Sequence, residues 1–250
     1  MKHNPMKEIL GIALVCSLVS SAPAKRAEDP PTSYDARVTF VRLRYNYTAD
    51  PSFGTRQMRD PPWHHDYPQA ETNLMHILSE VTSVAPFRDG GRIIDIGDPE
   101  LLKYPIAYMS EPGFWSMTEQ EVENMRNYLL KGGFLIFDDF GGSHWSNLSR
   151  QMGRILPKGR WIQLDANHPL FHSFFDIDTF ANLQPSYRGQ PVFFGLFEDN
   201  DTTKRMYAIA NYNNDIGENW EWSETGLVPI DAENEAYKFG VDYIIYGLTH

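Results

Sequence analysis

The residues best suited to chemistry lie in short polar segments that each follow a predicted strand. The most informative pair is Asp138-Asp139, which comes directly after the apolar stretch 134–137. Adjacent carboxylates at the end of a buried strand repel each other and lose hydration, so a cation, a helix N-terminus or hydrogen bonds must compensate. One of the two could therefore bind a metal or act as an acid or base. The competing interpretation is that one carboxylate caps the turn at 143–146 and the other faces solvent or pairs with arginine.

A second polar segment is His64-His65-Asp66, which lies in a long loop. Adjacent histidines can both bind a metal only if the loop bends, and their spacing matches no common zinc motif. Together with His144 and either Asp138 or Asp139, they could form a divalent-metal site of imidazole and carboxylate ligands. Alternatively, Asp66 caps the following helix and the histidines pack in the loop. A divalent metal is thus one candidate cofactor, and no cofactor is certain.

Other candidates complete the list. Glu111, before Pro112-Gly113, is a catalytic carboxylate or an ordinary turn acid. The catalytic candidates are therefore Asp138, Asp139 and Glu111, and the ligand-binding candidates are Trp63, His64, His65, Asp66, Gly141, Gly142, His144 and Trp145. The paired glycines lack the spacing of a phosphate-binding loop, which gives nucleotide binding little support.

The elements that would position these residues alternate between strands and helices. Strands are expected at 38–45 (close to a sheet edge), 93–96, 104–109, 134–137, 191–197 and 205–210, and the last two are a candidate hairpin. Helices are expected at 70–81, 118–131 (with a Thr118–Glu121 capping box), 146–156 and 237–248. This alternation predicts a three-layer α/β sandwich, with a mostly parallel sheet and helices on both faces. Ligands bind beyond the carboxyl ends of such strands, so the polar segments should meet at one edge.

The N-terminal residues predict export. Residues 1–24 begin weakly basic, continue with an apolar run and end at Ala22-Pro23-Ala24, which is the layout of a secretory signal peptide. We expect a flexible linker at 25–36, a single α/β domain at 37–250, and no membrane span once the signal is cleaved. The protein would then be periplasmic or secreted. The one cysteine, Cys16, lies within the predicted signal, so the remaining chain would have no thiol chemistry and no disulfide.

Charge and aromatic content narrow the class of partner. The formal net charge is −11 and the lysines and arginines are scattered, which disfavours nucleic acid and anionic membrane surfaces. Six tryptophans fall mostly in predicted loops. Exposed aromatic rings at a cleft suit sugar or peptide binding, although a buried tryptophan can equally fix a long loop to the body. The partner is expected to be an envelope ligand or protein that the sequence does not identify.

Several stretches resemble an uncharacterised bacterial family, domain of unknown function 4159. The stretches are 41–45, 63–74, 104–109, 121–128, 132–139, 168–171 and 237–241, and the Gly-Gly-Phe-Leu-x-x-Asp-Asp part of 132–139 is the most specific. The likeness spans about residues 36–249. It implies a relation to the class I glutamine amidotransferase fold, a flavodoxin-like sandwich. Those enzymes use a cysteine nucleophile, and here the matching turn carries Asp138-Asp139, so their mechanism is excluded.

Three functional hypotheses follow. The first is an exported domain that binds a ligand or partner at the strand ends without the ancestral nucleophile. The second is a metal-assisted hydrolase acting on carbohydrate or another envelope substrate, with Asp138 or Asp139 assisted by His64, His65 or His144. The third is a structural scaffold in an envelope complex. A deep polar site would favour the hydrolase, and a shallow apolar patch would favour the scaffold.

Overall fold

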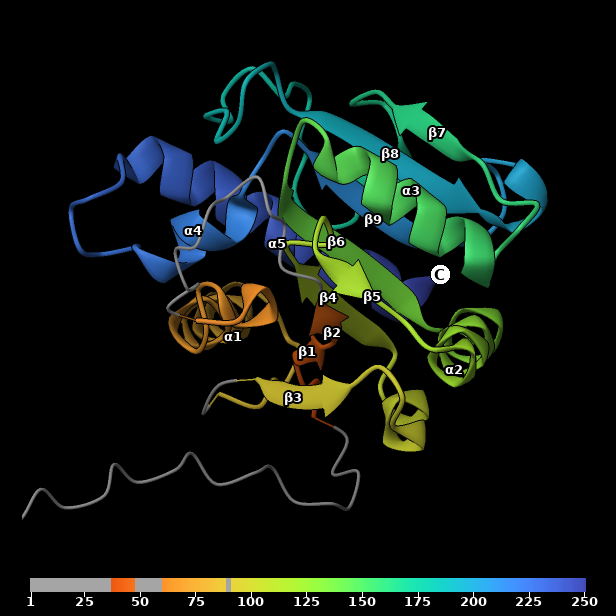
Figure 1. The fold of residues 1–250 in the computed structure, drawn as a ribbon. Helices are drawn as coiled ribbons and strands as arrows, with labels where there is room; N and C mark the ends of the chain where they lie inside the picture. The colour runs from red at the N-terminus through yellow and green to blue at the C-terminus, as the bar shows by residue number, and fades with distance from the viewer. Residues whose placement is uncertain (1–36, 48–59, 89–90) are drawn as a thin grey trace, which may run out of the picture.

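The computed structural model describes residues 37–47, 60–88 and 91–250 (Figure 1). The predicted signal peptide and linker lie outside these residues. Seven strands form the main sheet in the order β3-β1-β4-β6-β9-β8-β7. Their bounds are β1 Val41–Arg44, β3 Arg92–Asp95, β4 Ile106–Ser110, β6 Phe134–Phe140, β7 Trp161–Leu164, β8 Val192–Phe197 and β9 Met206–Tyr212. A small antiparallel ribbon pairs β2 Asn46–Tyr47 with β5 Trp115–Ser116.

The sheet is mostly parallel, as predicted. β1 pairs in parallel with β3 and β4, β4 with β6, and β6 with β9, whereas β8 and β7 add antiparallel strands at one side. β8 and β9 pair as the expected hairpin. β1 lies next to the edge strand β3, as its two arginines indicated. Every residue of β4 and β6 is buried, which is typical of strands covered on both faces.

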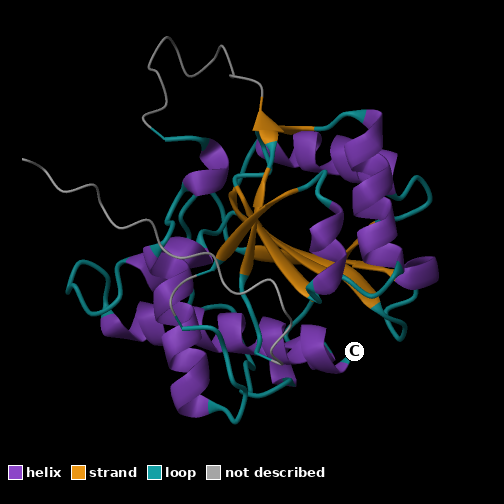
Figure 2. Cartoon of the chain, turned by 90° about the horizontal axis from the view of Figure 1, so that it is seen from below, coloured by secondary structure: helices purple, strands orange, loops and turns teal. Residues whose placement is uncertain are grey.

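Helices cover both faces of the sheet (Figures 1 and 2). α1 Gln69–Val81, α4 Ile216–Glu221 and α5 Ile230–Thr249 pack together on one face, and α2 Glu119–Leu130 and α3 His144–Ile155 pack on the other. Short 3-10 helices occur at Pro62–His64 (η2), Pro99–Lys103, Pro169–His172 and Glu198–Asn200. In the described part of the chain, no helix combines the length and the apolar character needed to cross a bilayer.

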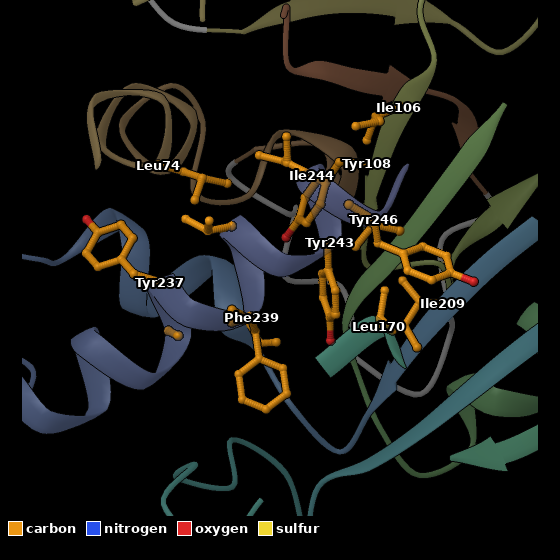
Figure 3. Packing of buried hydrophobic residues seen from close by; sticks show 14 of the residues in the cluster. Leu74, Ile106, Tyr108, Leu170, Ile209, Tyr237, Phe239, Tyr243, Ile244 and Tyr246 are labelled. Atoms are coloured by element: carbon orange, nitrogen blue, oxygen red, sulfur yellow. The ribbon is translucent and has the colours of Figure 1, made fainter. Parts of the chain in front are cut away.

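Two hydrophobic cores result from this arrangement, because alternate strand residues point to opposite faces. On β4, Ile106 and Tyr108 face the core beneath α1 and α5, whereas Ala107 and Met109 face the core beneath α2 and α3. Figure 3 shows the first core, where side chains of α5 pack towards Ile106 and Tyr108 of the sheet.

Local sequence signals explain most helix boundaries. The predicted capping box is confirmed: Thr118 Oγ1 accepts from the Glu121 amide at 3.3 Å, and a Glu121 carboxylate oxygen accepts from the Thr118 amide at 2.7 Å. The predicted start of the next helix at Ser146 is wrong. α3 begins at His144, and its N-cap residue Ser143 makes no capping bond with its side chain. β7 and α4 were not predicted, because both are short and lack a clear apolar period.

Candidate functional site

The candidate site lies where the chain changes direction across the sheet. From β1 the chain first moves outward to β3 and then returns past β1 to β4, so the carboxyl ends of β1 and β4 form a topological switch point. Ligand sites in open α/β sheets lie at such points. The segments that follow β1, β4, β6 and β9 meet there, as the strand-end rule predicted for the first three.

Four side chains from three of these segments form a compact cluster of potential metal ligands. They are His65 and Asp66 after β1, Asp139 near the end of β6, and Asp215 after β9. One nitrogen or oxygen atom from each lies within 4.8 Å of the corresponding atoms of the other three. The three aspartates are buried, and the His65 side chain is 49% exposed at the mouth of the cluster. Three carboxylates and one imidazole are a donor set suited to a divalent cation.

Among the described residues, Asp66 is the one whose two carboxylate oxygens are both buried without a hydrogen-bond partner. Its side chain is fully buried, and neither carboxylate oxygen receives a hydrogen bond from a described residue. The Nδ1 atom of His65 lies 3.6 Å from Asp66 Oδ1, which is too long for a hydrogen bond. Burial raises the pKa of Asp66, and Asp139 raises it further. A buried carboxylate without donors costs free energy unless a ligand compensates.

Asp139 holds the centre of the cluster. It sits at a bulge, where the register between β6 and β9 shifts between Phe137 and Phe140, and its φ of 58° is left-handed. His65 Nδ1 lies 2.7 Å from Asp139 Oδ2, and the Tyr187 hydroxyl donates to Asp139 Oδ1 at 2.6 Å. Burial acts to raise the pKa of Asp139, but these contacts prevail and lower it. The hydrogen bond to Asp139 raises the pKa of His65 to about 10, so a protonated imidazole balances part of the acidic charge.

Asp138 points the other way, into the first core. Its carboxylate accepts hydrogen bonds from the Tyr108 hydroxyl, the Asn211 amide and the backbone amides of Ile216 and Gly217, all at 2.8 to 3.0 Å. Burial raises its pKa to about 6, although the hydrogen bonds oppose that shift. Because α4 begins at Ile216, these bonds fix the start of the helix and therefore the preceding Asp215.

A buried ion pair holds the other half of the cluster. Arg42 of β1 pairs with Glu71 of α1, and both side chains are almost completely buried. The guanidinium also donates to the backbone oxygens of Trp63 at 3.1 Å and His65 at 2.7 Å. A planar donor with several N–H groups can bind all these acceptors at once. Arg42 therefore fixes the path of the segment that carries His65 and Asp66.

Glu111 lies beside the cluster in the turn after β4. Its φ of 47° is left-handed, and the Tyr45 hydroxyl donates to its backbone oxygen at 2.9 Å. Burial, followed by the negative charge of Asp139, raises the pKa of the Glu111 carboxyl to about 8. A carboxyl group with such a pKa can take up or release a proton near neutral pH, which is what a general acid or base requires.

Comparison with known families agrees with the resemblance seen in the sequence. The family model "Domain of unknown function (DUF4159)" matches residues 39–248. The chain belongs to this family. No curated protein matches the chain.

The structure of this DUF4159 domain separates the sequence candidates into two groups. His65, Asp66 and Asp139 come together, and Glu111 lies next to them. Among the described residues, the four-residue cluster does not include His64, Asp138 or His144. The His64 ring packs against Trp63 and Tyr67, and the His144 ring packs against Phe114.

The remaining candidates, Gly141, Gly142 and Trp145, lie outside the four-residue cluster, in or beside the turn that follows β6. The Tyr187 ring covers Gly141 so closely that a Cβ there would lie 2.6 Å from Tyr187 Cγ, so this position requires glycine. Gly142 adopts a left-handed φ of 55° in the same turn. Trp145 packs among aromatic rings, with its centroid 4.5 Å from that of Phe194.

Sequence reasoning missed two residues of the DUF4159 site. Asp215 follows β9, and the relevant signal was present in the run Asn213-Asn214-Asp215 after an apolar strand. It was overlooked because the strand was interpreted only as half of a hairpin, whereas β9 also pairs in parallel with β6. Tyr187 lies in an irregular segment without periodicity, and no sequence signal marks it.

A groove of about 450 Å³ adjoins the cluster at the carboxyl ends of β1 and β3. Its lining includes Trp63, Tyr47, Arg44, Asp95 and Glu121. Trp63 of η2 lies two residues before His65, so the segment 62–66 contributes both to the groove and to the cluster. Both therefore lie at the same edge of the sheet.

Proposed function

We propose that this DUF4159 domain is a metal-assisted hydrolase whose divalent cation binds between His65, Asp66, Asp139 and Asp215 and replaces the proton that His65 carries in the metal-free protein. The proposal rests on the four potential ligand atoms that lie within 4.8 Å of one another. One of them belongs to the buried carboxylate of Asp66, which receives no hydrogen bond from the described residues. Metal–ligand bonds of about 2.0–2.2 Å place opposite ligand atoms about 4.4 Å apart, so a contraction of a few tenths of an ångström would suffice. Mixed carboxylate and imidazole donors suit Mn²⁺ or Zn²⁺.

The residues around the cation site would divide the chemistry between them. A divalent cation bound there would polarise a substrate oxygen and lower the pKa of a water molecule. Glu111 would transfer the proton, since its pKa of about 8 lets it exchange one near neutral pH. Tyr187 and Arg42 would act as positioning residues, through the hydroxyl bond to Asp139 and the backbone bond to His65.

Three acids of the site share an unusual backbone conformation, which supports a functional rather than a purely structural role. Asp66, Glu111 and Asp139 have φ values of 64°, 47° and 58°. Non-glycine residues seldom adopt the left-handed region, and such outliers concentrate at functional sites.

The finer fold assignment belongs to the same proposal. The five parallel strands follow the order 2-1-3-4-5 when they are numbered among themselves, which is the flavodoxin-like order. Asp139 has a left-handed conformation near the end of a central strand that leads into a helix, a context similar to that of a nucleophile elbow. We therefore propose a flavodoxin-like sandwich related to the class I glutamine amidotransferases, exported by the signal peptide expected at 1–24.

Hydrolysis of simple chromogenic substrates tests the proposal. The purified protein is stripped with EDTA, reloaded with Mn²⁺ or Zn²⁺, and assayed with nitrophenyl esters, phosphates and glycosides. We expect metal-dependent hydrolysis of at least one class and a loss of at least about a hundredfold in Asp139→Asn.

Asp176→Asn is the matched control, because it alters a surface His172–Asp176 contact of 3.2 Å. This variant should hydrolyse like the wild type. Absence of hydrolysis by the metal-loaded protein, or activity unaffected by both EDTA and Asp139→Asn, would contradict the proposal.

A further inference from the structure

We infer that the groove beside the cluster binds a neutral carbohydrate, so that the substrate of the proposed hydrolase is a glycan. The inference rests on the proposed function and names its substrate class. It is carried by the groove's aromatic rings, by its planar polar side chains and by its charge.

Two aromatic side chains offer apolar contact surface in the groove. Tyr47 is 41% exposed although it lies in a β-strand, and Trp63 is partly buried against the second core. Tyr47 is held in place because β2 pairs with β5, where Tyr47 lies opposite Trp115. The C–H face of a pyranose ring packs on such a surface, and a fixed ring loses little conformational entropy when the ligand binds.

Planar polar groups surround these rings. The Arg44 guanidinium makes two hydrogen bonds of 2.5 Å with the Asp95 carboxylate, and both side chains remain about half exposed. Asn46 Nδ2 donates to Glu121 Oε1 at 3.2 Å. The two pairs keep donors and acceptors in fixed positions. Neighbouring sugar hydroxyls need this combination, because each hydroxyl both donates and accepts a hydrogen bond.

The charge of the groove argues against an anionic ligand. Arg44 is already paired with Asp95, and Glu121 adds a negative charge, on a chain whose formal net charge is −11. Phosphate and carboxylate ligands would therefore be repelled. A purely apolar ligand would leave the charged groups without hydration or partners. A neutral sugar matches both the rings and the polar groups.

The position of the groove relates it to the cation site. Trp63 lines the groove, and its backbone oxygen and that of His65 bind the same Arg42 guanidinium. Tyr45 also lines the groove, and its hydroxyl donates to the backbone oxygen of Glu111. A glycan chain in the groove would thus extend towards His65 and Glu111, the groups that the proposed hydrolysis uses.

Binding of neutral oligosaccharides tests the inference. Cellohexaose, chitohexaose and maltohexaose are titrated into the metal-loaded protein by calorimetry and saturation-transfer NMR. We expect at least one to bind, and we expect Tyr47→Ala to weaken its Kd roughly tenfold, the effect of losing one aromatic contact. Asp95→Asn, a second exposed change in the groove, should also weaken binding.

Phe174→Ala is the matched control, because it removes an aromatic ring of similar exposure (45%) beside α5. It should leave the Kd within about twofold. Failure of all three sugars to bind, or unchanged binding by both groove variants, would overturn the inference. Asp139→Asn separates the two proposals. If Asp139→Asn no longer binds Mn²⁺ but still binds the sugar, the groove binds sugar independently of the metal. If the wild type binds the sugar but takes up no metal, only the hydrolase proposal is contradicted.

Discussion

Asp138 and Asp139, the two adjacent buried carboxylates near the end of β6, have different surroundings. Asp138 accepts four hydrogen bonds from the protein, two of them from the start of α4. Asp139 instead faces two other buried aspartates, and its region contains a carboxylate, Asp66, that receives no hydrogen bond among the described residues. Both oxygens of Asp138 are hydrogen-bonded by the protein, whereas the surroundings of Asp139 leave the neighbouring Asp66 without a donor. We propose from this difference that the first region stabilises the fold and that the second binds a cation.

The largest effect on the free energy of unfolding should come from removing the fully hydrogen-bonded carboxylate of Asp138. Asp138→Ala leaves the Tyr108 hydroxyl, the Asn211 amide and two backbone amides buried without an acceptor, so the free energy of unfolding should fall by at least about 3 kcal/mol. Asp139→Ala relieves repulsion between carboxylates but removes the acceptor of the His65 and Tyr187 hydrogen bonds, so it should lower the free energy of unfolding by less, about 1–2 kcal/mol. Urea unfolding of the metal-free proteins measures both. Equal losses would remove the distinction between the two regions.

The converse comparison concerns metal affinity. Asp139→Asn removes a charged ligand from the centre of the cluster, so its Kd for Mn²⁺ should rise at least about a hundredfold. Asp176→Asn should bind Mn²⁺ like the wild type, because its carboxylate is at the surface and outside the cluster. Titration calorimetry on EDTA-stripped protein measures both values. Retention of wild-type affinity by Asp139→Asn would show that the cation binds elsewhere.

Asp242 is intermediate between Asp138 and Asp66, because it is a buried acid of which only one carboxylate oxygen is hydrogen-bonded. Its Oδ1 accepts from the amides of Phe174 and Phe175, whereas its Oδ2 has no hydrogen-bond partner among the described residues. Burial raises its pKa from 3.8 to about 7. The folded protein therefore keeps a proton there that the unfolded chain has released, and this group's contribution to stability falls as pH rises towards 7.

The expected decline from this group is about 2 kcal/mol between about pH 5.5 and pH 7. Asp242→Asn cannot titrate, so this part of the pH dependence should disappear. Urea unfolding at a series of pH values, without added metal, measures the slope. A variant whose slope equals that of the wild type would show that Asp242 is ionised in the folded protein throughout this range.

The smallest expected effect tests how Asp139 is oriented. Tyr187→Phe removes the hydroxyl that donates to Asp139 Oδ1 and should weaken Mn²⁺ binding by about tenfold, as the loss of a group that orients a ligand does. Tyr212→Phe is the matched control, because its hydroxyl makes only a 3.4 Å contact with the Gly142 oxygen. Equal Kd values for the two variants would assign Tyr187 a packing role over Gly141.

The sequence predicted the sheet that positions the site better than it predicted which side chains come together there. Apolar strands that alternate with amphipathic helices indicated a mostly parallel sheet, and the strand-end rule then placed His65, Asp66, Glu111 and Asp139 at one edge. The rule could not separate Asp138 from Asp139, because the bulge that turns them apart depends on pairing with a strand about 70 residues later. The local periodicity of apolar residues does not predict such long-range strand pairing.

The same limit explains the candidates that lie elsewhere. His144 was placed in a loop before a helix at 146, but α3 begins two residues earlier and carries the ring to Phe114. Asp215 joined the cluster only because β9 lies beside β6, which a hairpin pattern does not reveal. The proposed cation site thus combines three residues that the sequence analysis named as site candidates, His65, Asp66 and Asp139, with Asp215, whose place depends on tertiary pairing.

Anomalous diffraction from crystals soaked in Mn²⁺ tests the central claim most directly. We predict one strong peak within bonding distance of His65, Asp66, Asp139 and Asp215, and its loss in crystals of Asp139→Asn. A wild-type crystal without a peak in this cluster, or with its Mn²⁺ bound only at another group of acids, would contradict the assignment of the cluster as a cation site.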